Sequence, residues 1–174
     1  LWITPMRALA ADTARALLTP RTRAIVLVSP NNPGGAEYPA EVLRGFLDLA
    51  REAGIHLIVD ETYKDFDSRS GAPHDLLADA GDTLVQLYSF SKANRLTGHR
   101  VGAVIGPVSL LPEIEKFLDT VTICAPQLGQ RAALWGLRNL GPGQPQPAIG
   151  QHRQRAQRLF QTVDPAEPAA NRPQ

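Results

Sequence analysis

The sequence predicts an α/β protein in which an open, mostly parallel β-sheet lies between two layers of helices, a three-layer αβα arrangement. Short apolar runs, each typical of a strand buried on both faces, alternate with longer segments in which apolar residues recur at helical spacing. This alternation favours parallel strands, because a parallel pair needs a long crossover connection and a helix usually provides it.

The expected strands are apolar runs bounded by turn residues or polar clusters. They are "RAIVLVSP" (23–30), "IHLIVDE" (55–61), "TLVQLYS" (83–89) and "VGAVIGP" (101–107). The first run is followed by "NNPGG", in which Asn, Pro and Gly each favour a turn. The connection between the second and third runs is polar and contains Gly and Pro.

Helical spacing marks the other segments. The expected helices are residues 12–18, 39–54, 112–121 and 126–140. The second of these begins at Pro39 and ends at Gly54, because proline suits the first helical turn and glycine suits the position after the last. Its expected buried face holds Val42, Phe46, Leu49 and Ala53. The expected buried face of the last helix holds Leu128, Ala132 and Trp135.

Composition excludes several classes of protein. Lys and Arg total 18 against 17 for Asp and Glu, and a net charge of +1 does not indicate a nucleic-acid or membrane partner. The single cysteine, Cys124, can form neither an internal disulfide nor a thiolate metal site, which fits a reducing compartment. No apolar run approaches the roughly 20 residues that span a bilayer. We therefore expect a cytoplasmic protein without a metal.

The last part of the chain differs in composition from the rest. From Gly141 onward it is rich in Gln, Pro and Arg and poor in branched aliphatic residues, a composition that buries little apolar surface. We expect residues 1–140 to form a partial domain and residues 141–174 to be an atypical tail, disordered or read in a shifted frame after Leu140.

Polar residues follow each of the first three expected strands. They are Asn31-Asn32-Pro33, Asp60-Glu61-Thr62-Tyr63 and Ser89-Phe90-Ser91-Lys92. Taken one at a time, these residues have simpler roles as turn formers, helix caps or solvated side chains. In an open α/β sheet, however, ligands bind at the carboxyl ends of the strands, so the clusters are expected to converge on one edge.

Their combined chemistry suits pyridoxal phosphate. Ser89, Ser91 and Arg100 offer the hydroxyl and guanidinium donors that bind a phosphate. Lys92, beside another cation, is suited to form a Schiff base. Asp60 could keep a pyridine nitrogen protonated, and Asn and Tyr side chains can hydrogen-bond a phenolic oxygen.

The motifs "SPNNPGG", "VDETYKDF" and "YSFSKANRLTGHRVG" also carry a family resemblance. In this order and at these intervals they resemble the large domain of the fold type I, class I/II pyridoxal-phosphate-dependent aminotransferases, over roughly Thr4–Leu140. The family usually has Thr where this chain has Gly34. We expect the turn to form nevertheless, because glycine accepts more backbone conformations.

The resemblance implies roles for individual residues. The catalytic set is Lys92, which forms the Schiff base, Asp60, which pairs with the pyridine nitrogen, and Tyr63. The cofactor-binding set is Asn32, Asp60, Tyr63, Ser89, Ser91, Lys92 and Arg100. In this set Asn32 and Tyr63 match the donors to the ring 3-oxygen, and Ser91 is the weaker candidate for a phosphate ligand.

The implied activity is transfer of an amino group between an amino acid and a 2-oxo acid, in a homodimer. Family members extend beyond both ends of this chain, so the resemblance implies a fragment truncated at both ends, with weak activity or none. Two alternatives stay open: a carbon–sulfur lyase that uses the same cofactor, and a cofactor-binding sensor domain of a transcription regulator. Dinucleotide-binding and P-loop motifs do not occur in the sequence.

Overall fold

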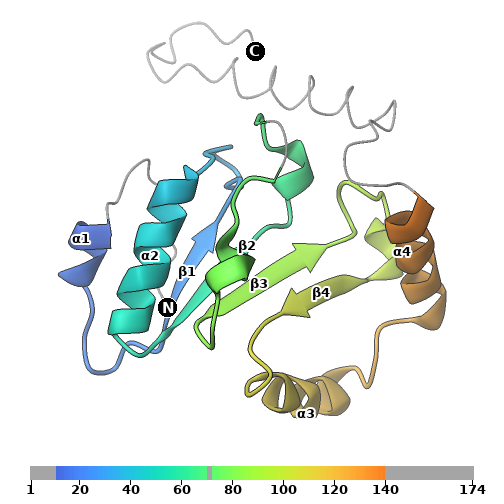
Figure 1. Cartoon of the computed structure of the whole chain (residues 1–174). Coiled ribbons are helices and arrows are strands. Elements are labelled where there is room, and N and C mark those ends of the chain that lie inside the picture. Colours follow the sequence, from blue (N-terminus) through green and yellow to red (C-terminus); the bar gives the residue numbers. More distant parts are fainter. Residues whose placement is uncertain (1–10, 70–71, 140–174) are drawn as a thin grey trace, which may run out of the picture. The chain divides into compact units, whose positions relative to one another are not determined.

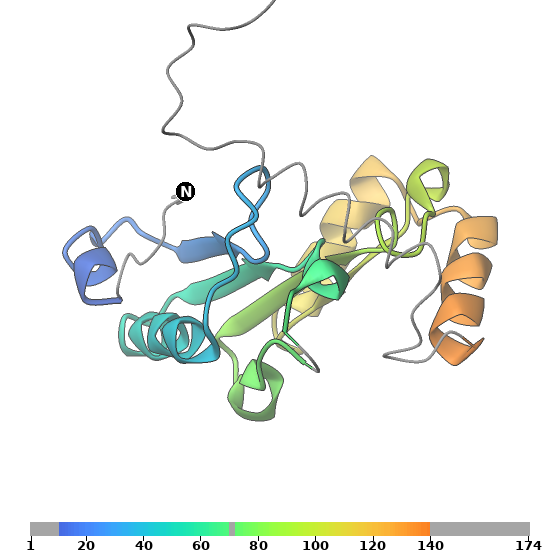
Figure 2. The same cartoon turned by 90° about the horizontal axis from the view of Figure 1, so that it is seen from above.

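The computed structural model describes residues 11–69 and 72–139, which lie within one unit, Leu1–Gly143. Its centre is a four-stranded sheet in the order β1-β2-β3-β4 (Figures 1 and 2). The strands are β1 (Ala24–Val28), β2 (His56–Asp60), β3 (Leu84–Ser89) and β4 (Gly102–Ile105). The first three are parallel and β4 is antiparallel to β3. The predicted open, mostly parallel sheet is therefore confirmed.

Helices and short 3-10 turns connect and follow the strands. The α-helices are α1 (Ala11–Arg15), α2 (Ala40–Glu52), α3 (Leu111–Val121) and α4 (Gln127–Asn139). The 3-10 turns are η1 (Lys64–Phe66), η2 (Leu76–Asp79) and η3 (Thr97–His99). The expected tail, residues 141–174, lies outside the described residues.

The main core lies between the sheet and α2, which runs along one face (Figures 1 and 2). In β1, Ile25 and Leu27 are buried on this face, whereas Val26 is only half-buried on the other. Helix α2 contributes large apolar side chains: Leu43, Phe46, Leu47, Leu49 and Ala50. The predicted face was correct at Phe46 and Leu49 but wrong at Ala53, which is exposed at the end of the helix.

Helix α4 packs through the side next to the one predicted, because its buried residues each follow a predicted residue by one position. Leu128 and Trp135 are 71% and 60% exposed, while Gly129, Ala133 and Gly136 are buried. A side chain at Gly129 would not fit, because an added Cβ would lie 2.8 Å from the backbone oxygen of His99. The helix therefore approaches the loop before β4 through its small residues, and helical spacing of large residues did not reveal this.

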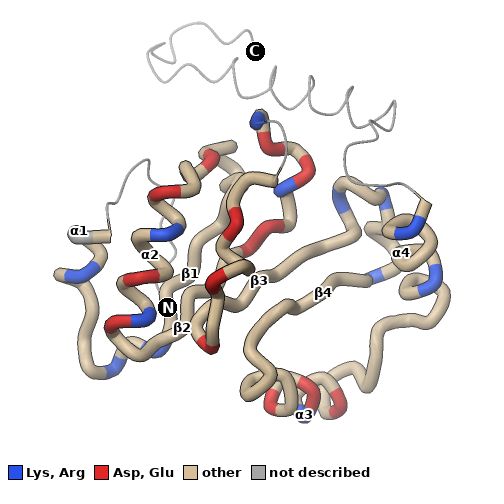
Figure 3. The backbone as a smooth tube through the Cα atoms, in the orientation of Figure 1, with Lys and Arg blue, Asp and Glu red and all other residues tan. Residues whose placement is uncertain are grey.

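Charged residues of both signs occur on α2 and on α3 (Figure 3). On α2, for example, Arg51 lies 3.1 Å from Asp48. Among the described residues, no helix has the length and apolar character needed to cross a membrane.

Candidate functional site

The carboxyl ends of β1, β2 and β3 lie at one edge of the sheet. The strand register places Val28 beside Asp60 and Asp60 beside Leu87. Past the strands, the amide of Ser29 donates to the carbonyl of Asp60 (3.0 Å), and the amide of Glu61 donates to the carbonyl of Leu87 (2.8 Å). The loops that carry the predicted site residues therefore start from a hydrogen-bonded, common edge.

The turn after β1 presents Asn32. It is closed by a hydrogen bond from the amide of Gly35 to the carbonyl of Asn31 (2.7 Å), and Gly35 has a positive φ of 67°. The side chain of Asn31 is buried and accepts from the amide of Gly34 (3.3 Å). The expected turn thus forms with Gly34, and neighbouring Asn32 remains exposed.

Three predicted site residues come together above this edge. The amide nitrogen of Asn32 lies 3.4 Å from the hydroxyl of Tyr63, at hydrogen-bond distance. The amine of Lys92 lies 5.8 Å from the centroid of the Tyr63 ring. Side chains from the loops after β1, β2 and β3 therefore surround one small region.

The environment of Lys92 differs from that of the other lysines. Lys64 lies 4.9 Å from the centroid of the Tyr88 ring, and Lys116 forms an ion pair of 2.6 Å with Glu113. Within the described ranges, the Lys92 amine has neither a hydrogen bond nor an ion pair, and its residue is exposed. Lys64 likewise has only a ring contact, but it is half-buried over Tyr88, whereas exposed Lys92 lies beside Tyr63 at this edge.

Asp60 keeps part of its hydrogen-bonding capacity. Its Oδ1 accepts from the backbone amide of Thr62 at 2.9 Å, which fixes the carboxylate at the end of β2. Its Oδ2 has no protein donor in the part of the chain that the structure describes. One oxygen thus orients the side chain, and the other can accept from a ligand.

Glu61, the next residue, belongs to a buried cluster on the α2 side of the sheet. Its Oε1 lies 2.6 Å from Nε2 of His74, and its Oε2 accepts from the amide of Gln86 at 3.0 Å. The amide of Leu76 donates to Nδ1 of His74 at 3.3 Å. Since Nδ1 accepts, Nε2 carries the proton and donates it to Glu61.

This cluster corrects one expectation about the site. The sequence placed Glu61 in the group expected to converge on the ligand, but its side chain turns away and is only 5% exposed. Sequence reasoning also missed His74 and Gln86. Gln86 did leave a signal, because a polar residue inside a buried apolar run needs a buried partner.

The expected phosphate ligands lie at the end of β3, which holds Ser89, and on the loop from β3 to β4, which holds Ser91 and Arg100. The hydroxyl of Ser89 accepts from the amide of Ser91 at 3.2 Å, so its own proton remains available to another acceptor. Ser91 is buried, with 8% of its surface exposed. Arg100, with a positive φ of 51°, donates through Nη1 to the carbonyl of Thr97 at 3.1 Å and is otherwise exposed.

Tyr88 connects the segments that carry Tyr63 and Lys92. Its hydroxyl lies 2.7 Å from Oδ2 of Asp65 and 3.0 Å from Oδ1 of Asn94. Burial, and then the hydrogen bond to Asp65, raises the pKa of Tyr88 well above its ordinary value. The phenol therefore keeps its proton to a higher pH than an ordinary tyrosine, and its contacts with Asp65 and Asn94 link the two segments.

Comparison with known proteins identifies relatives of this chain. Residues 5–165 match the family described as "Aminotransferase class I and II". The chain is 36% identical to an arginine–pyruvate transaminase of Pseudomonas aeruginosa over 129 residues, 73% of this chain. It is 32% identical to an aspartate aminotransferase of Thermotoga maritima over 127 residues, 72% of this chain. It spans 33% and 34% of the lengths of these relatives.

Solved structures agree with this match. The aspartate aminotransferase of Thermus thermophilus with maleate aligns with a TM-score of 0.71 and 30% identity, over 87% of this chain and 38% of that one. The N-succinyldiaminopimelate aminotransferase of Mycobacterium tuberculosis aligns with a TM-score of 0.75 and 26% identity, over 87% and 39%. The fold, the matched range and these relatives together show that the chain belongs to the class I and II aminotransferase family.

Proposed function

We propose that this chain carries the pyridoxal-phosphate site of an aminotransferase that moves an amino group between an amino acid and a 2-oxo acid. The observation that carries the proposal is the meeting of Asn32, Tyr63 and Lys92, with the amine of Lys92 left without a hydrogen bond among the described residues. Family membership supports the reaction class, and the relatives' printed names support amino-acid and oxo-acid substrates.

The residues present fit this cofactor. Asn32 and Tyr63 place an amide and a hydroxyl donor beside each other, an arrangement suited to a ring oxygen. Asp60 offers Oδ2 to the N–H of a protonated pyridine nitrogen while Thr62 holds Oδ1. Ser89 supplies a hydroxyl donor to the phosphate. Bound pyridoxal phosphate would supply an aromatic ring that takes up negative charge from the substrate α-carbon.

Each residue then has a separate task. Lys92 would hold the cofactor through Nζ and would move a proton at the substrate α-carbon. Arg100 is anchored by its bond to Thr97 and directs its remaining N–H groups to the phosphate, and Ser91 is a second hydroxyl candidate there. We also propose that the protein is a homodimer, as its resemblance to the class I/II aminotransferases implies, and that the tail after residue 140 is atypical.

Covalent trapping tests this proposal. Pyridoxal 5′-phosphate is added to the chain, an absorbance spectrum is recorded, and borohydride reduction is followed by peptide mapping. We expect the reduced label on Lys92, with no label in a Lys92→Ala variant. Lys64→Ala is the matched control and should label as the unchanged chain does, because Lys64 lies over the ring of Tyr88 rather than that of Tyr63. Label on Lys64 or Lys116 in the unchanged chain would refute the assignment.

Product analysis tests the reaction class on the protein assembled with any further parts it needs. An aminotransferase converts the amino acid to a 2-oxo acid and leaves the cofactor aminated, whereas a carbon–sulfur lyase releases ammonia. We expect the first result. Ammonia release without cofactor amination would favour the lyase.

A further inference from the structure

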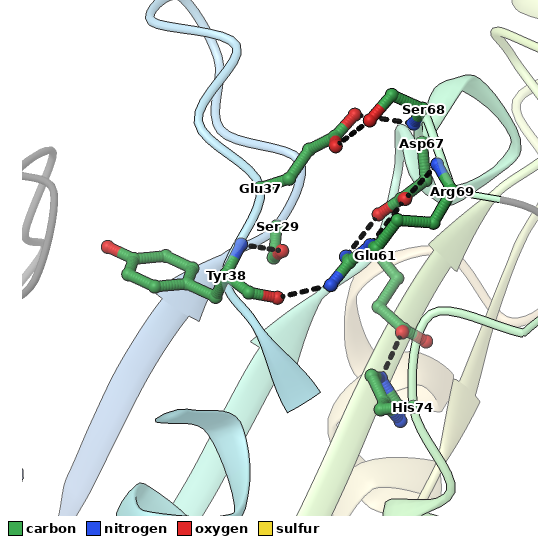
Figure 4. Close-up of polar contacts among 8 residues, drawn as sticks. All are labelled: Ser29, Glu37, Tyr38, Glu61, Asp67, Ser68, Arg69 and His74. Atoms are coloured by element: carbon green, nitrogen blue, oxygen red, sulfur yellow. Dashed lines mark hydrogen bonds and ion pairs between the residues drawn. The ribbon is translucent and has the colours of Figure 1, made fainter. Parts of the chain in front are cut away.

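The loops that carry Asn32 and Tyr63 are joined at a second place, away from the site, by contacts that run in both directions (Figure 4). From one side, Glu37 accepts from the amide of Ser68 at 2.6 Å and from the hydroxyl of the same residue. From the other, Nη1 of Arg69 donates to the carbonyl of Tyr38 at 2.9 Å. We call these contacts the clasp.

Arg69 is held rigidly within the clasp. Its Nε lies 2.7 Å from Oδ1 of Asp67 and its Nη2 lies 2.5 Å from Oδ2, a two-point pairing with a carboxylate that is only 4% exposed. The hydrogen bond to Asp67 raises the pKa of Arg69. Only the planar guanidinium can bind a carboxylate at two points and still donate to Tyr38, so lysine is no substitute.

The Tyr38 end of the clasp is connected to Asn32. Tyr38 is buried, and its amide donates to the hydroxyl of buried Ser29 at 3.1 Å (Figure 4). The intervening turn is closed where the amide of Asn31 donates to the carbonyl of Ala36 at 2.7 Å. A displacement of Tyr38 would therefore be passed through this closed turn to Asn32.

The other end of the clasp is connected to Tyr63. The amide of Asp67 donates to the carbonyl of Lys64 at 3.1 Å, and the amide of Phe66 donates to the carbonyl of Tyr63 at 2.9 Å. These bonds make η1 a short rigid link. Hydrogen bonds thus connect Arg69 to Tyr63 through Asp67 and η1.

We propose that Arg69 and Glu37 are positioning residues that hold the donors of Asn32 and Tyr63 together for the ring oxygen of the cofactor. The direct contact between those donors is 3.4 Å, too long to fix two loops by itself. The clasp closes the same pair of loops with shorter and charged bonds. The inference rests on the proposed function, because the cofactor oxygen is the group the donors serve.

The test compares two ligands that differ at this oxygen. Pyridoxal 5′-phosphate and 3-deoxypyridoxal 5′-phosphate, which lacks the ring hydroxyl, are titrated into the full chain and into its variants. A general loss of structure weakens both ligands equally, whereas misplaced donors weaken only the first. The ratio of the two Kd values therefore isolates positioning from stability.

We expect Arg69→Met and Arg69→Lys each to reduce the preference for the hydroxylated ligand about tenfold, because the hydrogen bonds from both donors weaken. Glu37→Ala, which removes only the other half of the clasp, should reduce it about threefold. Arg44→Met is the matched control. Its side chain is 36% exposed against 33% for Arg69 and is ion-paired on the α2 side, so the preference should not change.

An unchanged preference in both Arg69→Met and Glu37→Ala would overturn the inference, as would rescue by Arg69→Lys. Hydrogen exchange on the unliganded chain separates this inference from the proposed function. The amides of Asn31 and Gly35 should exchange about tenfold faster in Arg69→Met than in Arg44→Met. Failure of the unchanged chain to bind either ligand would refute the proposed function, and equal exchange in the two variants would refute the clasp.

Discussion

Asp60 and Glu61 follow one another at the end of β2, but their carboxylates lie on opposite sides of the sheet and have different partners. Glu61 is buried on the α2 side, where His74 and Gln86 each donate to one of its oxygens. Asp60 is half-buried, and the amide of Thr62 occupies only one of its oxygens. Since side chains alternate along a strand, neighbouring acids at a strand end can serve the core and a ligand respectively.

The two acids show that polar groups on the two sides of the sheet, at this edge, have different partners. On the α2 side, polar groups satisfy each other because a buried carboxylate without donors is costly. On the other side, Asp60 and Lys92 keep atoms without protein partners among the described residues. Hydrogen-bonding capacity that is left open beside a satisfied cluster is what a ligand site requires.

The largest expected effect comes from removing the buried carboxylate of Glu61. Glu61→Ala leaves the buried donors of His74 and Gln86 without an acceptor and should lower the free energy of unfolding by about 3 kcal/mol. Asp60→Ala loses a single hydrogen bond from Thr62 and should cost about 1 kcal/mol or less. Urea unfolding of both variants measures the difference through the midpoint and slope.

Glu61→Gln is the control for this comparison, because it keeps the shape of the side chain and removes its charge. It should destabilise less than Glu61→Ala, since His74 can still donate to the amide oxygen. Equal losses of stability in Asp60→Ala and Glu61→Ala would show that the two acids do not differ in burial and hydrogen-bond partners in the way described.

The next effect concerns Tyr88, which faces the same side of the sheet as Gln86. Burial and Asp65 raise the pKa of Tyr88 above its ordinary 10.0, so the folded chain keeps a proton that the unfolded chain loses at higher pH. This stabilisation is complete below pH 10.0 and is lost as the pH rises above it. Tyr88→Phe should lower the free energy of unfolding by about 1 kcal/mol at pH 7.

The pH dependence distinguishes this role from simple packing. Tyr88→Phe should lose less stability than the unchanged chain between pH 9 and pH 11, as measured by urea unfolding at each pH. Asp65→Asn keeps the phenol and removes the carboxylate, so its alkaline loss should be intermediate. Parallel curves for Tyr88→Phe and the unchanged chain would contradict the raised pKa.

The sequence was sufficient for features that depend on local pattern. Apolar runs predicted all the strands of the described sheet, and polar residues after them predicted which loops bring Asn32, Tyr63 and Lys92 together. Gly34 was correctly expected to permit the turn. These features follow from strand periodicity, from turn chemistry and from the rule that ligands bind at carboxyl ends.

Other features depend on contacts between distant residues. Arg69 reaches Tyr38 across 31 positions, and Glu61 pairs with His74 from a polar connection that carries no regular pattern. Helix α4 was assigned the wrong face because its large residues are exposed and Gly129 permits close approach. Periodicity assumes that large apolar residues mark the buried side, and here close packing of small residues determined it.

The smallest expected effect belongs to a third kind of acid, one on the outer surface. Asp75 pairs with Arg44 at 2.5 Å, and this hydrogen bond lowers the pKa of Asp75 below its ordinary 3.8. The pair's contribution to the free energy of unfolding is fully present above pH 3.8 and is lost as the pH falls through the lower pKa that Asp75 has in the folded chain. Asp75→Asn should therefore lower Tm slightly at pH 7, and less at high salt, because exposed ion pairs are screened.

Thermal unfolding from pH 7 down to pH 2 checks this expectation. The curves for Asp75→Asn and the unchanged chain should approach each other toward the acid end, as Asp75 becomes protonated. Asp82→Asn is the matched control, because Asp82 is exposed and has no ion pair or hydrogen bond within residues 11–69 and 72–139. A Tm loss for Asp75→Asn as large as that for Glu61→Ala would mean that burial does not separate these acids. Water can replace the lost partner of an exposed side chain such as Asp75, whereas the buried carboxylate of Glu61 is shielded from water.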